Sequence, residues 1–182
     1  MRKLRTSVFI ANLVALCVIF GVVDRVVSTG LVITGAFNIR IGLANIIVML
    51  GLVYFPFSDA KTIVILKSFL TNLILNGLRL FIQSFPASVL SFLVMWLLHK
   101  YFRKHISYIG ISVAGATVHI TVQLIVVRYV LFSGFDSAGS LLAGLLPYYL
   151  LTSVIAGVMI GMVLMKSTKY IDNAGVFKRQ DN

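Results

Sequence analysis

Long runs of apolar residues, separated by short polar stretches, dominate the chain. Runs of about 18 or more apolar residues are long enough to cross the hydrocarbon core of a bilayer as α-helices. The pattern therefore predicts an all-α integral membrane protein with one transmembrane domain over 1–182, a bundle of about six helices, and a polar cytoplasmic tail over 166–182. The predicted spans are 6–27, 39–55, 60–80, 86–102, 107–132 and 140–165.

Several local signals refine this picture. The spans over 39–55 and 60–80 are short, which favours little tilt or a position partly surrounded by protein. The stretch 28–38, rich in Gly, Thr and Ser, predicts an ordered loop or a lid over a site. Pro86 suits the first turn of the fourth helix, whereas Pro147 either kinks the sixth helix or marks its true start.

Composition excludes an ordinary water-soluble domain. Hydrophobic residues make up 59% of the chain and charged residues only 12%, and mean hydropathy is +1.02. Soluble domains carry about 25% charged residues, so only a lipid solvent accommodates this much apolar surface. The single cysteine, Cys17, excludes an internal disulfide and predicts a packed thiol.

Basic residues are distributed unevenly between the two sides of the predicted membrane domain. With the N-terminus inside, eleven lie on the cytoplasmic side and three, Arg25, Arg40 and Arg79, on the outer side. This asymmetry predicts a multi-pass plasma-membrane protein with both termini in the cytoplasm and a retained first helix. Anionic lipid explains the net charge of +11, and no nucleic-acid motif is visible. The eleven are Arg2, Lys3, Arg5, Lys61, Lys100, Arg103, Lys104, Lys166, Lys169, Lys178 and Arg179.

Polar residues inside the spans are costly in lipid and are therefore candidates for function. Those of the third span lie at i, i+4, i+8 and i+11, on one helical face, and those of the fifth share a face as well. The third span supplies Ser68, Asn72, Asn76 and Arg79, the fifth Ser112, His119 and Gln123, and the second Asn38, Arg40 and Asn45.

Arginines gather toward the outer half of the predicted bundle, where Arg40, Arg79 and Arg128 fall with Arg25 nearby in depth. The chain has no Glu and only five Asp, so most of these arginines lack carboxylate partners. Two interpretations stay open. The arginines form a pocket for a small anionic solute, or they reach outer lipid headgroups and helix-end carbonyls.

Two further polar groups also have alternative explanations. His119 is either a proton or ligand site or, with Gln123 one turn away, part of an interhelical hydrogen bond. Lys67, in the middle of the third span, either extends to the cytoplasmic surface or pairs within the bundle.

Small residues recur at a spacing that permits close helix contact. Gly157 and Gly161 form a GxxxG pattern, for which packing within the bundle is the simpler explanation. Ala11 and Ala15 form an AxxxA pattern, for which contact with a partner protein is at least as good an explanation.

Three sequence stretches carry a resemblance to a known family. They are Ala11-Asn-Leu-Val-Ala15, Arg40-Ile-Gly-Leu-Ala-Asn45, and Ser112-Val-Ala-Gly-Ala-Thr-Val-His119 with Gln123. In order and spacing the chain resembles the Gx transporter family, whose members are also described as heptaprenyl diphosphate synthase component I.

That family is similar to the S components of energy-coupling factor (ECF) transporters. The resemblance implies six helices, a pocket for a vitamin-like micronutrient below the loop over 28–38, and docking of Ala11 and Ala15 onto a membrane coupling protein driven by cytoplasmic ATPases. Some members are associated with flavin-based extracellular electron transfer and quinone metabolism.

The residues argue against catalysis by the chain alone. Prenyl elongation needs clustered carboxylates that hold Mg²⁺ on a diphosphate, and the five Asp are scattered. A Walker phosphate loop is also missing from the sequence. We therefore expect no enzyme activity, no cofactor and no metal site.

The leading hypothesis is a substrate-binding subunit for a small anionic micronutrient or precursor. The alternatives are a non-catalytic accessory subunit of heptaprenyl diphosphate or quinone synthesis, and a membrane anchor for extracellular electron transfer. The predicted site residues are Arg40, Asn45, Asn72, Asn76, Arg79, His119, Gln123 and Arg128.

Overall fold

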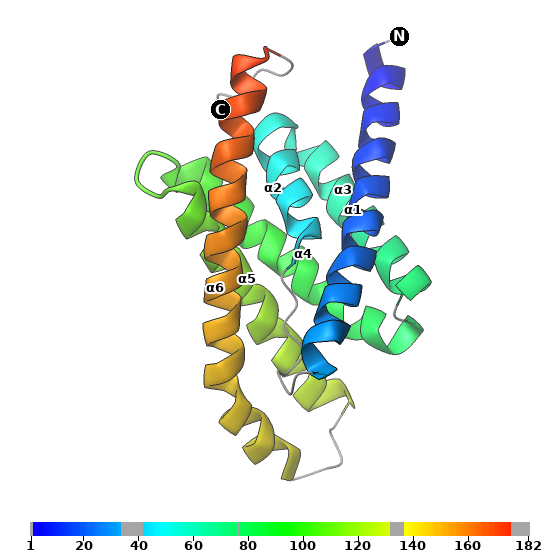
Figure 1. Cartoon of the computed structure of the whole chain (residues 1–182), viewed down its shortest axis with the longest axis vertical. Helices are drawn as coiled ribbons and strands as arrows, with labels where there is room; N and C mark the ends of the chain where they lie inside the picture. Colours follow the sequence, from blue (N-terminus) through cyan, green and yellow to red (C-terminus); the bar gives the residue numbers. More distant parts are fainter. Residues whose placement is uncertain (1, 34–41, 76, 132–136, 176–182) are drawn as a thin grey trace.

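The computed structural model describes residues 2–33, 42–75, 77–131 and 137–175, and within these ranges it contains helices and no strand (Figure 1). The prediction of an all-α protein is confirmed. The six α-helices and one π-helical turn are α1 (Arg2–Ile33), α2 (Ala44–Tyr54), α3 (Phe57–Leu75), α4 (Gly77–Phe102), α5 (Tyr108–Val126), η1 (Val127–Leu131) and α6 (Ser137–Asn173).

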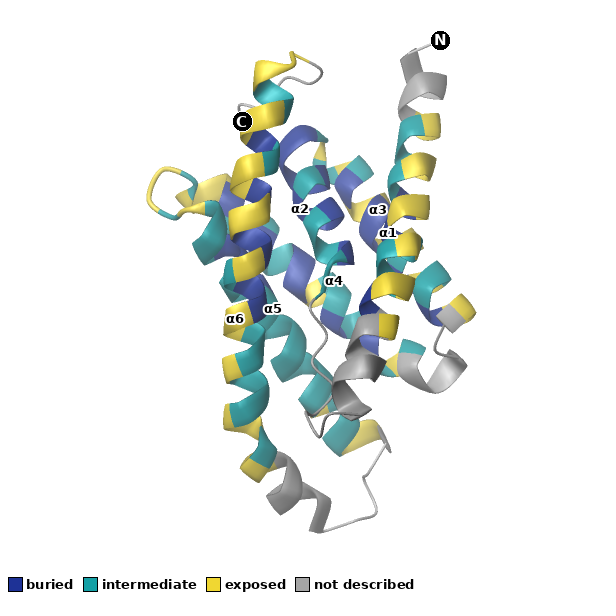
Figure 2. Cartoon of the chain, viewed as in Figure 1, coloured by how far each residue is buried: buried dark blue, intermediate teal, exposed yellow. Residues whose placement is uncertain are grey.

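The helices form a bundle in which α2 occupies a central position. Helices α3, α4, α5 and α6 pack in chain order, while α1 packs on α2 and α3, and α2 also contacts α6. Figure 2 shows α2 coloured mostly as buried. Only Asn45, Ile46 and Leu50 of α2 are not buried.

The short length of α2 follows from this position. With 11 residues it is about 16 Å long, shorter than a bilayer core. Neighbouring helices rather than lipid surround it, so it need not span the membrane by itself. The expectation that the second segment is partly surrounded by protein is therefore confirmed.

Among the described residues, four helices are long and apolar enough to cross a membrane, rather than six. The candidate spans are Ser7–Asp24, Phe81–Phe102, Tyr108–Val130 and Ala143–Asn173. Helix α3 carries Asp59, Lys61 and Lys67 within 19 residues, and α2 is too short. Large apolar side chains such as Val26, Leu73 and Leu151 are exposed on the outside of the bundle, as lipid contact requires.

Some predicted boundaries are wrong at their ends. Helix α1 continues to Ile33, so 28–33 is helical rather than a loop, and 34–38 lies outside the described residues. Ser and Gly each cost a helix no more than about 1 kcal/mol, which does not stop a helix that is already several turns long. Helix α4 begins at Gly77, so Pro86 lies inside it and not in its first turn. Helix α3 ends at Leu75, five residues before the predicted 80.

The sixth helix also differs from its predicted bounds. Pro147 lies inside α6 and does not mark its start. The helix continues to Asn173, so the first part of the predicted polar tail, 166–173, is helical. The Tyr54 hydroxyl donates to the Thr168 carbonyl oxygen (3.2 Å) and to Asp172 Oδ1 (2.9 Å). These tertiary contacts hold a segment that looks like a frayed end in the sequence. By contrast, the predicted 107–132 matches α5 together with η1.

The start of α1 and the end of α6 lie at the same end of the bundle, the upper end in Figure 1. Because Tyr54 contacts α6 near Asn173, the end of α2 and the start of α3 also lie there. Described basic residues gather at this end, on α3, α4, the following turn and α6. They are Lys61, Lys100, Arg103, Lys104, Lys166 and Lys169. We call the two ends the upper end and the lower end.

Helices α5 and α6 pack so closely that two glycines are required between them. A Cβ added at Gly161 would lie 2.5 Å from Ile109 Cα, and one at Gly157 would lie 2.7 Å from Val113 Cα. The prediction that the GxxxG pattern packs within the bundle is confirmed.

We therefore expect Gly161→Ala to lower the free energy of unfolding by roughly 1–3 kcal/mol, because the backbone of α5 must move away. Gly144→Ala is the matched control on the same helix, since no atom lies within 4 Å of its added Cβ. It should be neutral or stabilising by up to about 1 kcal/mol. Thermal unfolding in detergent measures both, and equal midpoints for the two variants would contradict the close packing.

Candidate functional site

A buried polar cluster lies where α1, the start of α2 and α3 meet. Asp24 on α1 is 8% exposed, and its Oδ1 and Oδ2 accept the Gly42 backbone N–H at 3.1 and 3.2 Å. Gly42 has a φ of +76°, a conformation that favours glycine. The carboxylate therefore lies at the N-terminus of α2, where the helix dipole stabilises negative charge.

Lys67 on α3 completes this cluster. Its Nζ donates a hydrogen bond to Asn45 Oδ1 on the first turn of α2. It also lies near enough to the Asp24 carboxylate for the two charges to interact. Of the two explanations for Lys67, pairing within the bundle is the correct one. Cys17 is fully buried, with its Sγ 3.8 Å from the Ala44 carbonyl oxygen, which confirms a packed thiol.

Polar groups continue along α3 beyond Lys67. Asn72 Nδ2 donates to the Ser68 carbonyl oxygen at 2.6 Å, and both residues are buried. The hydroxyls of Ser68 and Thr71 are buried and have no hydrogen-bond partner among the described residues. A buried hydroxyl without a partner costs about 1–3 kcal/mol. This part of α3 therefore has unused hydrogen-bonding capacity.

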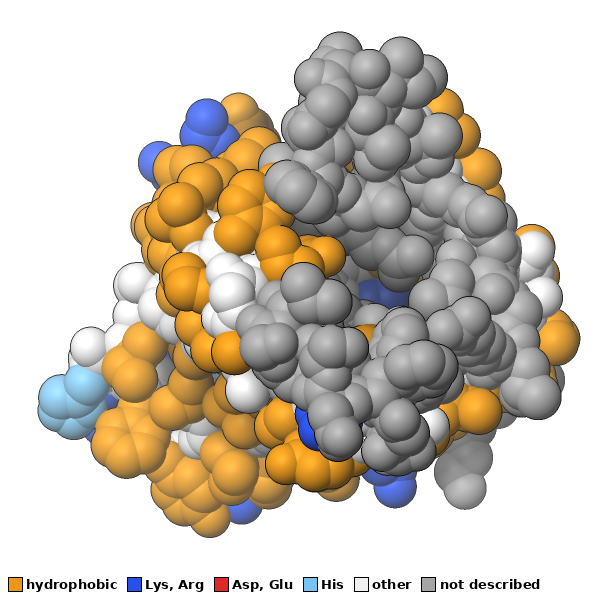
Figure 3. Space-filling view, turned by 90° about the horizontal axis from the view of Figure 1, so that it is seen from below, with side chains coloured by type: hydrophobic (Ala, Val, Ile, Leu, Met, Phe, Trp, Pro, Cys, Tyr) orange, Lys and Arg blue, Asp and Glu red, His pale blue; other side chains and the backbone are white. Residues whose placement is uncertain are grey.

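The cluster belongs to the lower half of the bundle. Asp24 lies in the last third of α1, toward the lower end of that helix. Asn45 lies at the start of α2, and the other end of α2 is at the upper end, where Tyr54 contacts α6. Seen from below, a basic side chain is visible near the middle of this face of the molecule (Figure 3).

The structure brings together only some of the predicted site residues. Asn45 accepts a hydrogen bond from Lys67, and Asn72 lies on the same helix as Lys67. His119 and Gln123 are half-buried on α5, whose principal neighbours are α4 and α6. Arg128 is half-buried in η1, with its guanidinium 5.9 Å from the ring centre of its neighbour Tyr129. Arg40, Asn76 and the side chains of Arg25 and Arg79 lie outside the described residues.

Sequence reasoning missed Asp24 and Gly42 and left Lys67 without a role. A signal was available, because Asp24 is the only acidic residue before Asp59 and Lys67 is a single charge in an apolar run. Charges of opposite sign at membrane depth require partners, and the structure places Asp24 near enough to Lys67 for the two charges to interact.

A family model, described as heptaprenyl diphosphate synthase component I, matches residues 13–166. The chain belongs to the heptaprenyl diphosphate synthase component I family. The match includes Asp24, Gly42, Asn45, Lys67 and Asn72, so the polar cluster lies within the part shared with the family. No curated protein and no solved structure matches the chain.

We expect Asp24→Ala to lower the free energy of unfolding by about 3 kcal/mol, because it removes the acceptor of the Gly42 N–H and leaves Lys67 without a nearby negative charge. Asp24→Asn keeps an oxygen acceptor and should cost less. Asp59→Ala is the control, since this half-exposed residue in the first turn of α3 should cost less than about 1 kcal/mol. Chemical denaturation in detergent compares the three, and an equal loss in Asp24→Ala and Asp59→Ala would argue against the cluster.

Proposed function

We propose that this family member is a substrate-binding subunit, similar to the S components of ECF transporters, that takes up a small acidic solute through the lower end of the bundle. The observation that carries the proposal is the part-buried ammonium of Lys67 on the same helix as the buried hydroxyls of Ser68 and Thr71, which have no hydrogen-bond partner among the described residues. The protein itself would not be catalytic.

The cluster has more hydrogen-bond donors than acceptors within the cluster that bind them. A lysine ammonium has three N–H donors, and Lys67 uses one on Asn45, with no further hydrogen bond among the described residues. Burying an ammonium is costly unless its donors are satisfied. A carboxylate or phosphate of a bound solute would accept from Lys67, while the hydroxyls of Ser68 and Thr71 would orient its polar part.

The predicted outer arginines fit the same hypothesis. Arg40 and Arg79 belong to the segments that follow the lower end of α1 and begin α4. Their positive charge would attract an acidic solute toward Lys67, whose own charge is partly balanced by Asp24. Asn45, Asn72, Asn76, His119, Gln123 and Arg128 remain proposed site residues.

Replacing Lys67 tests the pocket directly. Native mass spectrometry of the protein purified from its host membrane should identify a co-purifying acidic solute, and Lys67→Met should weaken its binding by about 10- to 100-fold, as loss of a charge-assisted hydrogen bond implies. Lys61→Met, at an exposed position of the same helix, should retain the solute. Equal retention by both variants would remove the central support for this function.

The outer face of α1 supports docking to a partner. Ala11 and Ala15 are exposed, on the side of α1 that faces away from α2 and α3, and Val8 and Val22 flank them. Small residues on an exposed helix face permit a second transmembrane helix to approach closely. We propose that a membrane coupling protein, driven by cytoplasmic ATPases, contacts this face.

Enlarging these alanines should disrupt the complex without disturbing the fold, because both side chains are exposed. We expect Ala11→Leu and Ala15→Leu to reduce co-purification of the coupling protein and ATPases at least about fivefold, a steric cost of roughly 1 kcal/mol or more. Val23→Leu, exposed on another part of the helix surface, is the control. Full recovery of the complex with both alanine variants would contradict the docking face.

The proposed orientation places the upper end in the cytoplasm of a plasma-membrane protein. Its support is the group of basic residues at that end, as the positive-inside rule requires. Labelling of Ser107→Cys by a membrane-impermeant thiol reagent in intact cells would contradict this orientation, and the buried Cys17 keeps the background low.

A second candidate function follows from the family description. In that case the chain would be a non-catalytic membrane subunit that assists heptaprenyl diphosphate synthesis, with chemistry supplied by a partner rich in aspartate. Co-purification with such a soluble synthase, in place of ATPases, would favour it. Recovery with a flavoprotein would instead favour a role as anchor in extracellular electron transfer.

A further inference from the structure

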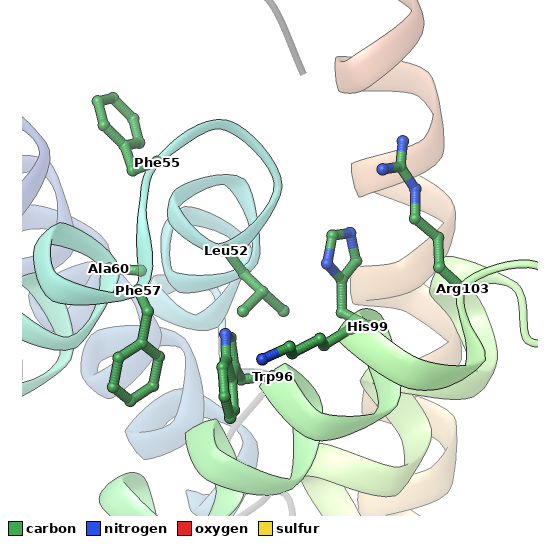
Figure 4. A pocket seen from close by; sticks show the side chains of 8 residues that line it. Leu52, Phe55, Phe57, Ala60, Trp96, His99 and Arg103 are labelled. Carbon is green, nitrogen blue, oxygen red and sulfur yellow. The ribbon is translucent and has the colours of Figure 1, made fainter. Parts of the chain in front are cut away.

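A cavity lies at the upper end, between the end of α2, the start of α3 and the last turns of α4 (Figure 4). It is remote from the cluster around Lys67, and nothing in the proposed function uses it. Its wall is apolar on α2 and α3 and mostly cationic or polar on α4. The main lining side chains are Leu52, Phe57, Trp96, His99, Lys100 and Arg103.

The α4 wall concentrates nitrogen donors in about one helical turn. His99 and Lys100 lie in the last turn of α4 and Arg103 directly follows the helix, at i, i+1 and i+4, and Figure 4 shows the side chains of His99 and Arg103 extending in the same direction. The Lys100 ammonium lies 4.9 Å from the centre of the Trp96 ring. Among the described side chains that line the cavity, none is acidic. The wall therefore favours an anion.

His99 gives independent evidence for a ligand. Its side chain is 9% exposed, it lines the cavity, and its Nε2 has no hydrogen-bond partner among the described residues. The ring stacks on Tyr108 with centroids 6.2 Å apart, which holds its orientation. An unpartnered buried nitrogen costs about 1–3 kcal/mol, a cost that an acceptor oxygen in the cavity would remove.

The surroundings of the cavity indicate an anion attached to a hydrocarbon chain. Leu97, Tyr101 and Phe102 are exposed on α4 next to the cationic wall. Aromatic residues together with Lys and Arg are typical of the membrane–water interface. Basic pockets between helices at this depth hold the headgroups of anionic lipids.

We propose that this cavity binds the phosphate group of an anionic membrane amphiphile, with His99, Lys100 and Arg103 around the phosphate oxygens and the hydrocarbon chain along the outer surface of α4. The Phe57 and Leu52 side chains close the apolar side. The site is independent of solute capture, because the two polar regions lie at opposite ends of the bundle.

Trp96 makes this proposal directly measurable. It is the only tryptophan in the chain and lines the cavity, so the indole emission comes from this site. The full-length protein in neutral detergent is titrated with phosphatidylglycerol, with phosphatidylcholine of the same acyl chains, and with inorganic pyrophosphate. We expect phosphatidylglycerol to change the Trp96 emission at a concentration at least about tenfold lower than phosphatidylcholine.

The variants separate a specific site from general attraction to anionic lipid. Arg103→Gln and His99→Gln should each raise the required phosphatidylglycerol concentration at least about fivefold, whereas Lys104→Gln, an exposed neighbour outside the cavity lining, should not. If Arg103→Gln or His99→Gln does not remain monodisperse, Lys100→Gln is used in its place, with the same expected effect.

Each outcome decides the matter. A response to phosphatidylglycerol alone supports a lipid headgroup as the ligand, and an additional response to pyrophosphate supports a phosphorylated amphiphile bound mainly through its phosphate. Equal responses to phosphatidylglycerol and phosphatidylcholine would overturn the proposal, as would equal sensitivity of Arg103→Gln, His99→Gln and Lys104→Gln.

Discussion

The contact between Asp24 and the Gly42 N–H, with Lys67 beside it, is the interaction on which the lower half of the bundle depends. It joins α1 to the residue two positions before α2 by both carboxylate oxygens. It also supplies negative charge near the part-buried ammonium of Lys67. In a low-dielectric bundle, each of these charges is costly unless opposite charge and hydrogen bonds surround it.

The central position of α2 follows from the same constraint. A short helix exposes unpaired N–H groups at its start, and lipid cannot satisfy them. Asp24 accepts the N–H of Gly42, two residues before α2 begins, and Asn45 in the first turn binds Lys67. Tyr54 at the other end of α2 donates to α6. Both ends of α2 are thus fixed by polar contacts, and its apolar side chains fill the middle of the core.

The two ends of the bundle have different chemistry. The lower cluster combines a carboxylate, an ammonium, amides and hydroxyls, which suits a small solute with several polar groups. The upper cavity combines cations with aromatic rings and exposed apolar side chains, which suits an amphiphile at the membrane surface. Close packing of α5 on α6 through Gly157 and Gly161 connects these ends by rigid helices.

The apolar runs and scarcity of charge were sufficient to predict an all-helical membrane protein, because hydrocarbon admits few other backbone conformations. The GxxxG pattern and the short second segment were also interpretable, since each depends on local spacing or length. Helix ends were less predictable. Helix α6 continues to Asn173, and its last turns contact Tyr54, a residue more than a hundred positions away in the sequence. A local pattern does not reveal such a contact.

For the candidate site, the sequence by itself determined which costly polar groups must find partners, including Asn45, Lys67 and Asn72. Only the tertiary structure decided that Asp24 reaches the start of α2, that Lys67 binds Asn45, and that His99 lines a cavity with Arg103. The physical reason is that hydropathy and periodicity act along one helix. The pairing of buried charges depends instead on which helices become neighbours and on the position along the bundle axis at which their side chains meet.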